Sequence, residues 1–262
     1  MPADVTPDQT ADALADALAD VRAELAPGGV LRAGINLSNI LLVTGRGAAG
    51  EPEGVSPDLA RAIAERLGLD VEYVTFPSPG ELADAAEATE VTVAESWDIG
   101  LIAAEAKRAE TIAFSPAYSE IEATYLVPAG SPIRTIEAVD RPGVRIAVSG
   151  RSAYDLYLTR TLTHAELVRG PGLDGAVEVF LAQKLDALAG LKPALMDNLA
   201  KLPGARILDG RFTAVQQAIG TQKHKTKAAA FLAAFVEEAK ASGLVAELID
   251  KHGVTGRLLV AG

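Results

Sequence analysis

Segments typical of strands and of helices alternate through most of this chain. Residues 30–35 and 71–76 have the apolar and β-branched content of strands, and residues 56–67 between them have helical spacing. Ser56 is a favoured helix cap, and Pro57 follows it at the first helical position, where proline is tolerated. A strand, a helix and a strand in this order form a right-handed crossover with parallel strands. The pattern therefore predicts an α/β fold.

A second series of the same kind follows. Strands are predicted at residues 144–148, 165–168, 186–189 and 205–208, and helices at 152–160 and 173–181. Residues 213–219 again have strand character, and helices at 225–241 and 245–251 complete the pattern. Two α/β series and a return of the chain indicate two Rossmann-like lobes with mainly parallel sheets, joined by a two-segment hinge.

These patterns divide the chain into three expected regions. Residues 1–29 form an N-terminal amphipathic helix and linker, residues 30–124 and 220–262 form lobe 1, and residues 125–219 form lobe 2. The hinge segments are expected near residues 123–127 and 214–219.

The N-terminal helix is expected over residues 8–25. Its apolar residues recur at spacings of three and four, and aspartates occupy the other face; the apolar residues are Ala11, Leu14, Leu18, Val21 and Leu25. About two heptads are too few to indicate a coiled coil. The apolar stripe is expected to pack either against the body of the protein or against a partner subunit.

Composition excludes several classes of function. The chain has 262 residues, 49% of them hydrophobic, which is enough to build a buried core. A formal net charge of -11 repels phosphate backbones and argues against nucleic-acid binding. The absence of cysteine excludes disulfides, thiolate metal sites and a cysteine nucleophile.

The first residues do not have the pattern of a secretory signal. Five aspartates precede the first basic residue, Arg22, whereas a signal peptide begins with a basic region and an apolar core. No apolar run approaches the roughly 18 residues that a membrane-spanning helix needs. A cytoplasmic location is therefore expected, and a periplasmic one only if the natural chain begins with a signal that this sequence lacks.

The two predicted sheets point to a binding site between them. Ligands of open α/β sheets bind beyond the carboxyl ends of the strands. In lobe 1 these ends supply Asn36, Ser38 and Asn39 after the first strand, and Ala103, Ala104 and Glu105 before Arg108. In lobe 2 they supply Ser149 and Ser152, and Tyr154 is a possible aromatic wall.

Arg108 and Ser152 are the strongest candidates among these residues. A guanidinium can hold a carboxylate through two charge-assisted hydrogen bonds, although an arginine near Glu105 and Glu110 is also compatible with an ordinary solvated surface. Ser152 begins a predicted helix, where its hydroxyl can cap the helix alone or share a ligand oxygen with the helix amides.

Several short motifs, in their order, resemble one known family. Gly54 to Ala60 opens the first helix, Arg108 leads into Phe114-Ser115-Pro116-Ala117-Tyr118, and Ser131-Pro132-Ile133 with residues 144–152 begins lobe 2; Leu185-Asp186-Ala187 and Lys192-Pro193 follow. Over about residues 30–252 the chain is similar to the bacterial solute-binding proteins of family 3, which bind polar amino acids and related small acids. The resemblance implies the two-lobed type 2 periplasmic-binding-protein fold, hinge closure and a role for Arg108 as the ligand's carboxylate anchor.

Two positions depart from the family pattern. Leu191 stands where the amino-acid binders have an acid for the ligand's ammonium group, and Val55 stands where an aromatic residue usually stacks on the ligand. A standard α-amino acid is therefore a less expected ligand. Other acids could meet a positive group on the ligand or could be ordinary surface acids; they are Glu95, Asp98, Glu105, Glu120 and Glu122.

The expected function is non-catalytic binding of a small carboxylate or amino-acid-like solute, with no cofactor and no metal. The partners implied are the small molecule and either transporter membrane subunits or a protein bound through the N-terminal helix. One alternative is a dehydratase-like enzyme that acts on small acids, with Glu105 as its general acid. Another is a cytosolic ligand sensor that uses the same closure.

Overall fold

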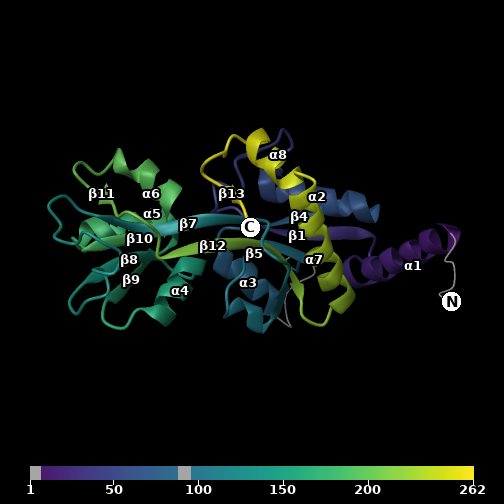
Figure 1. Cartoon of the computed structure of the whole chain (residues 1–262), viewed down its shortest axis with the longest axis horizontal. Helices are drawn as coiled ribbons and strands as arrows, with labels where there is room; N and C mark the ends of the chain where they lie inside the picture. Colours follow the sequence, from purple (N-terminus) through teal and green to yellow (C-terminus); the bar gives the residue numbers. More distant parts are fainter. Residues whose placement is uncertain (1–6, 88–95) are drawn as a thin grey trace, which may run out of the picture.

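The computed structural model describes residues 7–87 and 96–262. One long mixed sheet runs through the molecule in the order β4-β1-β5-β12-β7-β10-β8-β9 (Figure 1). Its two ends are parallel and its centre is antiparallel. The predicted α/β fold with two lobes of mainly parallel strands is confirmed, and the antiparallel strands between them join both lobes into one continuous sheet.

The first parallel end of the sheet comprises β4 (Asp70–Phe76), β1 (Val30–Asn36) and β5 (Ile99–Ala103). Helices on both sides cover it: α2 (Val55–Leu67), α7 (Thr226–Ala241) and α8 (Leu244–Lys251) share one core, and α3 (Pro79–Glu87) contributes to another. Alternation along β5 explains the two cores, because Ile99 and Leu101 belong to the first and Ile102 to the second.

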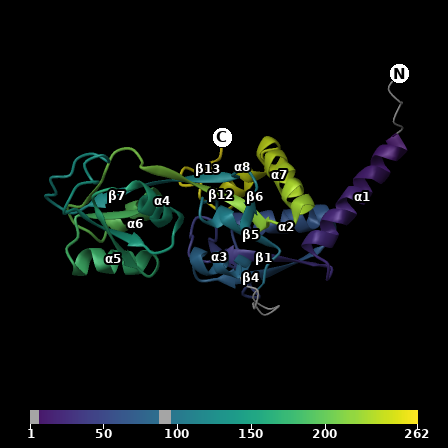
Figure 2. The same ribbon diagram turned by 90° about the horizontal axis from the view of Figure 1, so that it is seen from below.

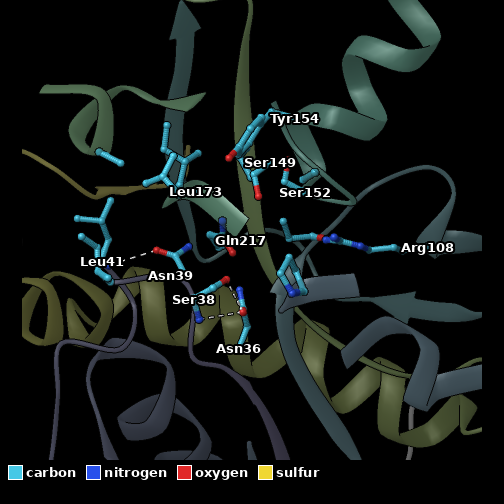
Figure 3. Close-up of a pocket in the computed structure, with 17 residues that line it drawn as sticks. Asn36, Ser38, Asn39, Leu41, Arg108, Ser149, Ser152, Tyr154, Leu173 and Gln217 are labelled. Carbon is cyan, nitrogen blue, oxygen red and sulfur yellow. Dashed lines mark hydrogen bonds between the residues drawn. The ribbon is translucent and has the colours of Figure 1, made fainter. Parts of the chain in front are cut away.

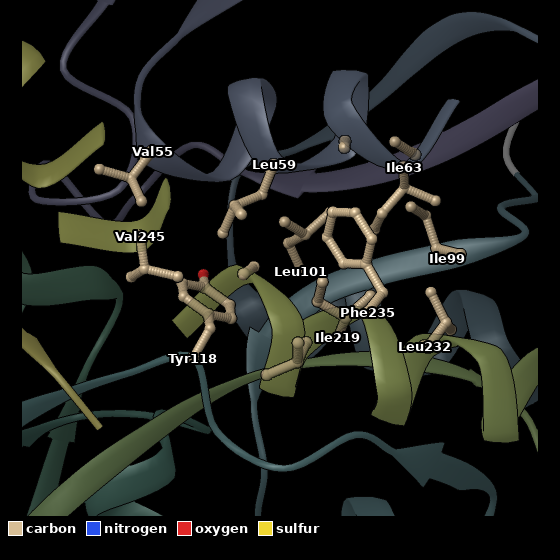
Figure 4. Packing of buried hydrophobic residues seen from close by; sticks show 14 of the residues in the cluster. Val55, Leu59, Ile63, Ile99, Leu101, Tyr118, Ile219, Leu232, Phe235 and Val245 are labelled. Atoms are coloured by element: carbon tan, nitrogen blue, oxygen red, sulfur yellow. The ribbon is translucent and has the colours of Figure 1, made fainter. Parts of the chain in front are cut away.

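The larger of these cores is almost entirely apolar. Val55, Leu59 and Ile63 from α2 share this core with Leu232 and Phe235 from α7 (Figure 4). Tyr118 is also fully buried there, and its hydroxyl satisfies its hydrogen-bonding capacity with Ser56 Oγ at 3.0 Å.

The second parallel end comprises β10 (Ala187–Leu191), β8 (Arg145–Ser149) and β9 (Glu166–Gly170). Three helices pack on it: α4 (Ala153–Thr161), α5 (Gly172–Ala182) and α6 (Lys192–Leu199). Its two buried clusters are formed almost wholly by residues 123–215. This distribution of cores agrees with the expected lobes, whose boundaries stay a prediction.

Two long strands join the two ends. β7 (Ser119–Val127) and β12 (Thr213–Gln222) pair antiparallel, with Thr213 opposite Ala123 and Gln217 opposite Ser119. The predicted hinge segments lie within these strands. The remaining short elements are β2 (Gly45–Arg46), β3 (Pro52–Glu53), the 3-10 turn η1 (Arg108–Glu110), β6 (Ile112–Phe114), β11 (Arg206–Ile207) and β13 (Leu259–Val260).

The N-terminal helix α1 (Pro7–Leu25) packs on the body by its last turns. Val21 and Leu25 are buried in the larger core beside α7, and Leu18 is half-buried against it. Asp20 pairs with Lys227 at 2.6 Å, and Glu24 accepts the main-chain N–H of Ala228. Towards its N-terminus the helix projects away from the rest of the molecule (Figure 2). At the C-terminal end of α1, the apolar stripe therefore packs against the protein's own body, which is one of the two expected packing modes.

Candidate functional site

A pocket of about 110 Å³ lies between the two ends of the sheet. On the same measure one water needs roughly 10–15 Å³, so the pocket has room for a small organic molecule. Nine of the residues expected from the sequence line it: Asn36, Ser38, Asn39, Ala103, Arg108, Ser149, Ser152, Tyr154 and Leu191. They lie at or just after the carboxyl ends of β1, β5, β8 and β10, in η1 and at the start of α4, and they converge from both halves of the molecule (Figure 3).

Arg108 is a buried cation in this pocket. Its side chain donates to the main-chain oxygen of Ala103 at 2.9 Å and to that of Arg151 at 3.0 Å. Across the described parts of the chain, no carboxylate oxygen lies within 4 Å of its guanidinium nitrogens. Burial, and secondarily the charge of Arg151, lowers the pKa of Arg108 to about 10. The group is still charged at neutral pH, and no acid among the described residues balances its charge.

The start of α4 supplies hydroxyl groups. Ser152 caps the helix, because its Oγ accepts the N–H of Asp155 at 3.1 Å. Burial raises the pKa of Tyr154, and the neighbouring hydroxyls of Ser152 and Ser149 oppose this rise. Capping by Ser152 is thus present, and its position on the pocket wall is compatible with a ligand contact as well.

The loop after β1 is held in place by its own side chains. Asn36 Oδ1 accepts the N–H of Ser38 at 3.1 Å and its hydroxyl at 2.8 Å, and Asn39 Oδ1 accepts the N–H of Leu41 at 3.2 Å. With both amide oxygens engaged, the amide nitrogens of Asn36 and Asn39 are the groups suited to donate to a ligand oxygen.

Three expected site residues do not line the pocket. Val55 is fully buried in the core, because Gly54 turns the chain with φ 149° against the Leu42 carbonyl and directs the next side chain inward. Glu105 is engaged by Arg160 and by the N–H of Lys107, which holds it away from the pocket. The N–H of Ala104 donates to the Gln216 carbonyl, in continuation of the pairing between β5 and β12.

The other acids considered for a cationic group also have partners elsewhere. Asp98 pairs with Lys225 at 3.1 Å, Glu120 with Arg211 at 3.4 Å, and Glu122 with Lys192 at 2.9 Å. Glu95 lies outside the described residues.

The pocket also has residues that sequence reasoning missed. Gln217 on β12 is buried, and the others are mainly apolar: Ile40, Leu41, Pro79, Ala153, Leu173, Ala194 and Val215. A glutamine in the middle of a strand that crosses the molecule was a signal for a polar contact. The apolar residues look like ordinary core residues in the sequence, and only their placement by the fold reveals them.

No helix in the described residues is both long and apolar enough to span a membrane. Within residues 7–87 and 96–262, His, Asp and Glu side chains form no group of three that could hold a metal ion.

The sequence profile of the bacterial extracellular solute-binding proteins, family 3, matches residues 42–255. The chain belongs to this family. Family membership agrees with the two-lobed architecture and with the resemblance found in the short motifs. No curated protein matches the sequence significantly.

Solved structures share the fold of this family 3 chain. A mutant of ArgBP from T. maritima has a TM-score of 0.68 at 22% identity, over 90% of this chain and 98% of that one. A putative ABC-transporter binding component from Wolinella succinogenes, complexed with lysine, has a TM-score of 0.68 at 20% identity, over 86% and 95% of the two chains. The ancestral amino acid-binding protein AncCDT-1, a precursor of cyclohexadienyl dehydratase, has a TM-score of 0.68 at 21% identity, over 87% and 97%.

Proposed function

We propose that this solute-binding protein captures a small carboxylate in the pocket between its lobes, with Arg108 as the anchor. The observation that carries the proposal is the buried charge of Arg108, which faces the pocket and has only carbonyl partners among the described residues. A buried cation is costly unless an anion pairs with it. A ligand carboxylate would supply that anion through two charge-assisted hydrogen bonds.

We further propose that the lobes close on the ligand about β7 and β12. Contacts that bridge the pocket support this motion: the Arg151 side chain, next to α4, pairs with Asp84 on α3 at 2.5 Å and donates to the Gly80 carbonyl at 3.2 Å. Arg108 adds its bond to the Arg151 carbonyl. Asp84, Gly80 and Arg108 all belong to the opposite half of the molecule from Arg151, so these three contacts form only when the halves lie together.

Binding without chemistry is favoured over a dehydratase activity. A general acid must reach the bound substrate. None of the described residues that line the pocket is acidic, and Glu105, the acid considered for that role, is engaged by Arg160. The similarity to a dehydratase precursor supports a shared fold only, since identity is 21%.

We also propose that the chain works outside the cytoplasm, as the family's description favours, and delivers its solute to transporter membrane subunits, a role supported by the fold it shares with a putative ABC-transporter binding component. A cytoplasmic sensor that signals through α1 is the second candidate, and the projection of this helix from the body supports it (Figure 2). Fractionation of the source cells, with antibody detection of the chain, separates the two roles.

Native mass spectrometry of protein purified without refolding tests the binding proposal. The expected result is a co-purified small acid on the wild type that is absent from Arg108→Gln. A wild type that stays unliganded during incubation with a broad carboxylate library would refute capture at this site.

A further inference from the structure

The charges and apolar groups of the pocket walls define the ligand more narrowly than the fold does. Building on the proposed carboxylate capture, we propose that the ligand is a monocarboxylate with an apolar tail and no amino group, such as a 2-oxo, 2-hydroxy or unsubstituted acid. The proposal rests on which charged groups reach the pocket, which do not, and how the apolar residues are arranged.

The pocket carries one formal charge. Among the described residues that line it, Arg108 is the only ionised side chain at neutral pH. A ligand of charge -1 balances it. A dicarboxylate would bring a second negative charge without a partner, and a zwitterion would bring an ammonium group without a partner.

Nearby acids are not available to an ammonium group. Glu105 is engaged by Arg160 and the Lys107 amide. Glu122, one strand away from Leu191, pairs with Lys192 at 2.9 Å, and this pair lines a separate cavity beside the C-terminal segment. Both acids therefore have their charges compensated outside the pocket that contains Arg108.

Leu191 takes the place where an acid would have to be. It ends β10, is half-buried, and lies on the pocket wall immediately before Lys192. Its side chain packs against the apolar clusters of both halves of the molecule. A positive group next to it would lose its hydration without gaining a hydrogen bond or a counter-ion.

The wall opposite the anchor is suited to a hydrocarbon tail. In Figure 3, Leu41 and Leu173 lie on one side of the pocket and Arg108 on the other. Leu191, Ala194 and Val215 extend the apolar lining. A ligand held by its carboxylate at Arg108 would thus direct an apolar tail of a few carbons towards these residues.

Neutral polar groups fill the space between anchor and tail. Ser149, Ser152, Asn36 and Gln217 can donate to an oxygen at the ligand's second carbon but carry no negative charge. An oxo or hydroxyl group is compatible with these donors, whereas an ammonium group requires acceptors and gains most from an anionic one.

Matched ligand series test the proposal on the full chain. Titration calorimetry would compare valine, leucine and phenylalanine with their 2-oxo acids and their des-amino acids, and glutarate with its monoacid of equal length. We expect at least one 2-oxo or des-amino acid to bind at least tenfold more tightly than its amino acid. Glutarate should bind at least tenfold more weakly than the monoacid of equal length. Arg108→Gln should weaken the binding of the preferred ligand at least tenfold.

A pair of variants at Leu191 tests the physical reason. Leu191→Asp should lower the ratio of the affinity for a 2-oxo acid to the affinity for its amino acid at least tenfold, because the new carboxylate can pair with the ammonium group. Leu191→Asn has nearly the same size without the charge and should leave the amino acid disfavoured. Thermal unfolding of both variants shows whether they are folded. If they are not, the ligand series on the wild type alone decides the proposal.

The outcomes separate the two proposals. If amino acids bind as tightly as their 2-oxo acids and Arg108→Gln abolishes the binding of both, the exclusion of the amino group is wrong and carboxylate capture stands. If no member of the series binds, or if Arg108→Gln leaves affinity unchanged, both proposals fail.

Discussion

Arg108 donates a hydrogen bond to the main-chain oxygen of Arg151 at 3.0 Å, so the guanidinium contributed by η1 is held against the loop that begins α4. The same side chain donates to Ala103 at the end of β5. One buried cation thus contacts the backbone of both halves of the molecule and faces the pocket between them. This arrangement couples the position of the two halves to the site where a ligand anion would bind.

Arg108→Ala should weaken binding of a carboxylate ligand at least tenfold. Removing one partner of a desolvated, charged pair costs about 2 to 5 kcal/mol. Titration calorimetry measures the loss, and Arg141→Ala, which removes an exposed arginine outside the pocket lining, is the matched control. Equal affinities of Arg108→Ala and the wild type would rule out the anchor role.

Ligand binding should reduce the dimensions of the protein in solution. Closure about β7 and β12 brings the two halves together, as in hinge motions of ligand-binding proteins. Small-angle X-ray scattering with and without ligand should give a smaller radius of gyration for the bound form. The Arg108→Ala variant under the same ligand concentration should keep the radius of the free form. Superimposable curves for free and bound wild type would show a preformed site.

The fold could be predicted from the sequence because its signals are local. Ser56 and Pro57 located α2 to within one residue, and the apolar alternation of β1 and β4 is visible without tertiary information. The predicted cap was wrong, because the helix begins at Val55 after Gly54 and the Ser56 hydroxyl pairs with Tyr118 in the core instead. The strand ends then place Asn36 and Arg108 at the edge of the first parallel end and Ser149 at the edge of the second, and the pocket lies between these two edges.

Residues whose role depends on long-range packing could not be assigned in this way. Val55 was expected at the ligand, but the Gly54 turn buries it under the core. Glu105 was considered a pocket acid, but Arg160, more than fifty residues away in the chain, engages it. Leu173 and Val215 line the pocket only because α5 and β12 are brought beside it.

Asp140 should make the stability of the protein depend on acidic pH. Partial burial alone would raise the pKa of Asp140, but the main-chain N–H groups of Thr163, Ala165 and His164 and the Thr163 hydroxyl outweigh it and hold that pKa well below its usual range. A carboxyl whose pKa is lower in the folded state contributes stability above its unfolded pKa, about 3.9, and loses it as pH falls through the folded pKa.

Asp140→Asn should therefore lower the free energy of unfolding at pH 7 by about 1.5 to 3 kcal/mol, the range for hydrogen bonds to a charged group. Urea unfolding of the variant and the wild type at several values from pH 2 to pH 7 measures this free energy. The difference between variant and wild type should shrink as pH falls below about 3.9. Exposed Asp209→Asn is the control for loss of one charge. A difference that is constant across this range would show that the carboxylate charge is not what stabilises the turn.

The ion pair between Asp84 and Arg151 should act on closure and little on folding. Its side chains are 60% and 57% exposed, and pairs this exposed contribute about 0 to 1 kcal/mol. Asp84→Asn is therefore expected to change the unfolding free energy by less than about 1 kcal/mol. The same substitution should weaken ligand binding by up to about fivefold, because the pair joins α3 to the loop before α4 only when the halves lie together. Because salt of about 1 M shortens the screening length to roughly 3 Å, the difference in affinity should disappear there and reappear at low salt. Titration calorimetry at both salt concentrations measures this difference in affinity. The control is Glu81→Gln, which also removes a negative charge from α3. Among the described residues, the Glu81 carboxylate contacts only its neighbour Ser78. An affinity difference that persists unchanged at high salt would mean that Asp84 acts by shaping α3 and not through its charge.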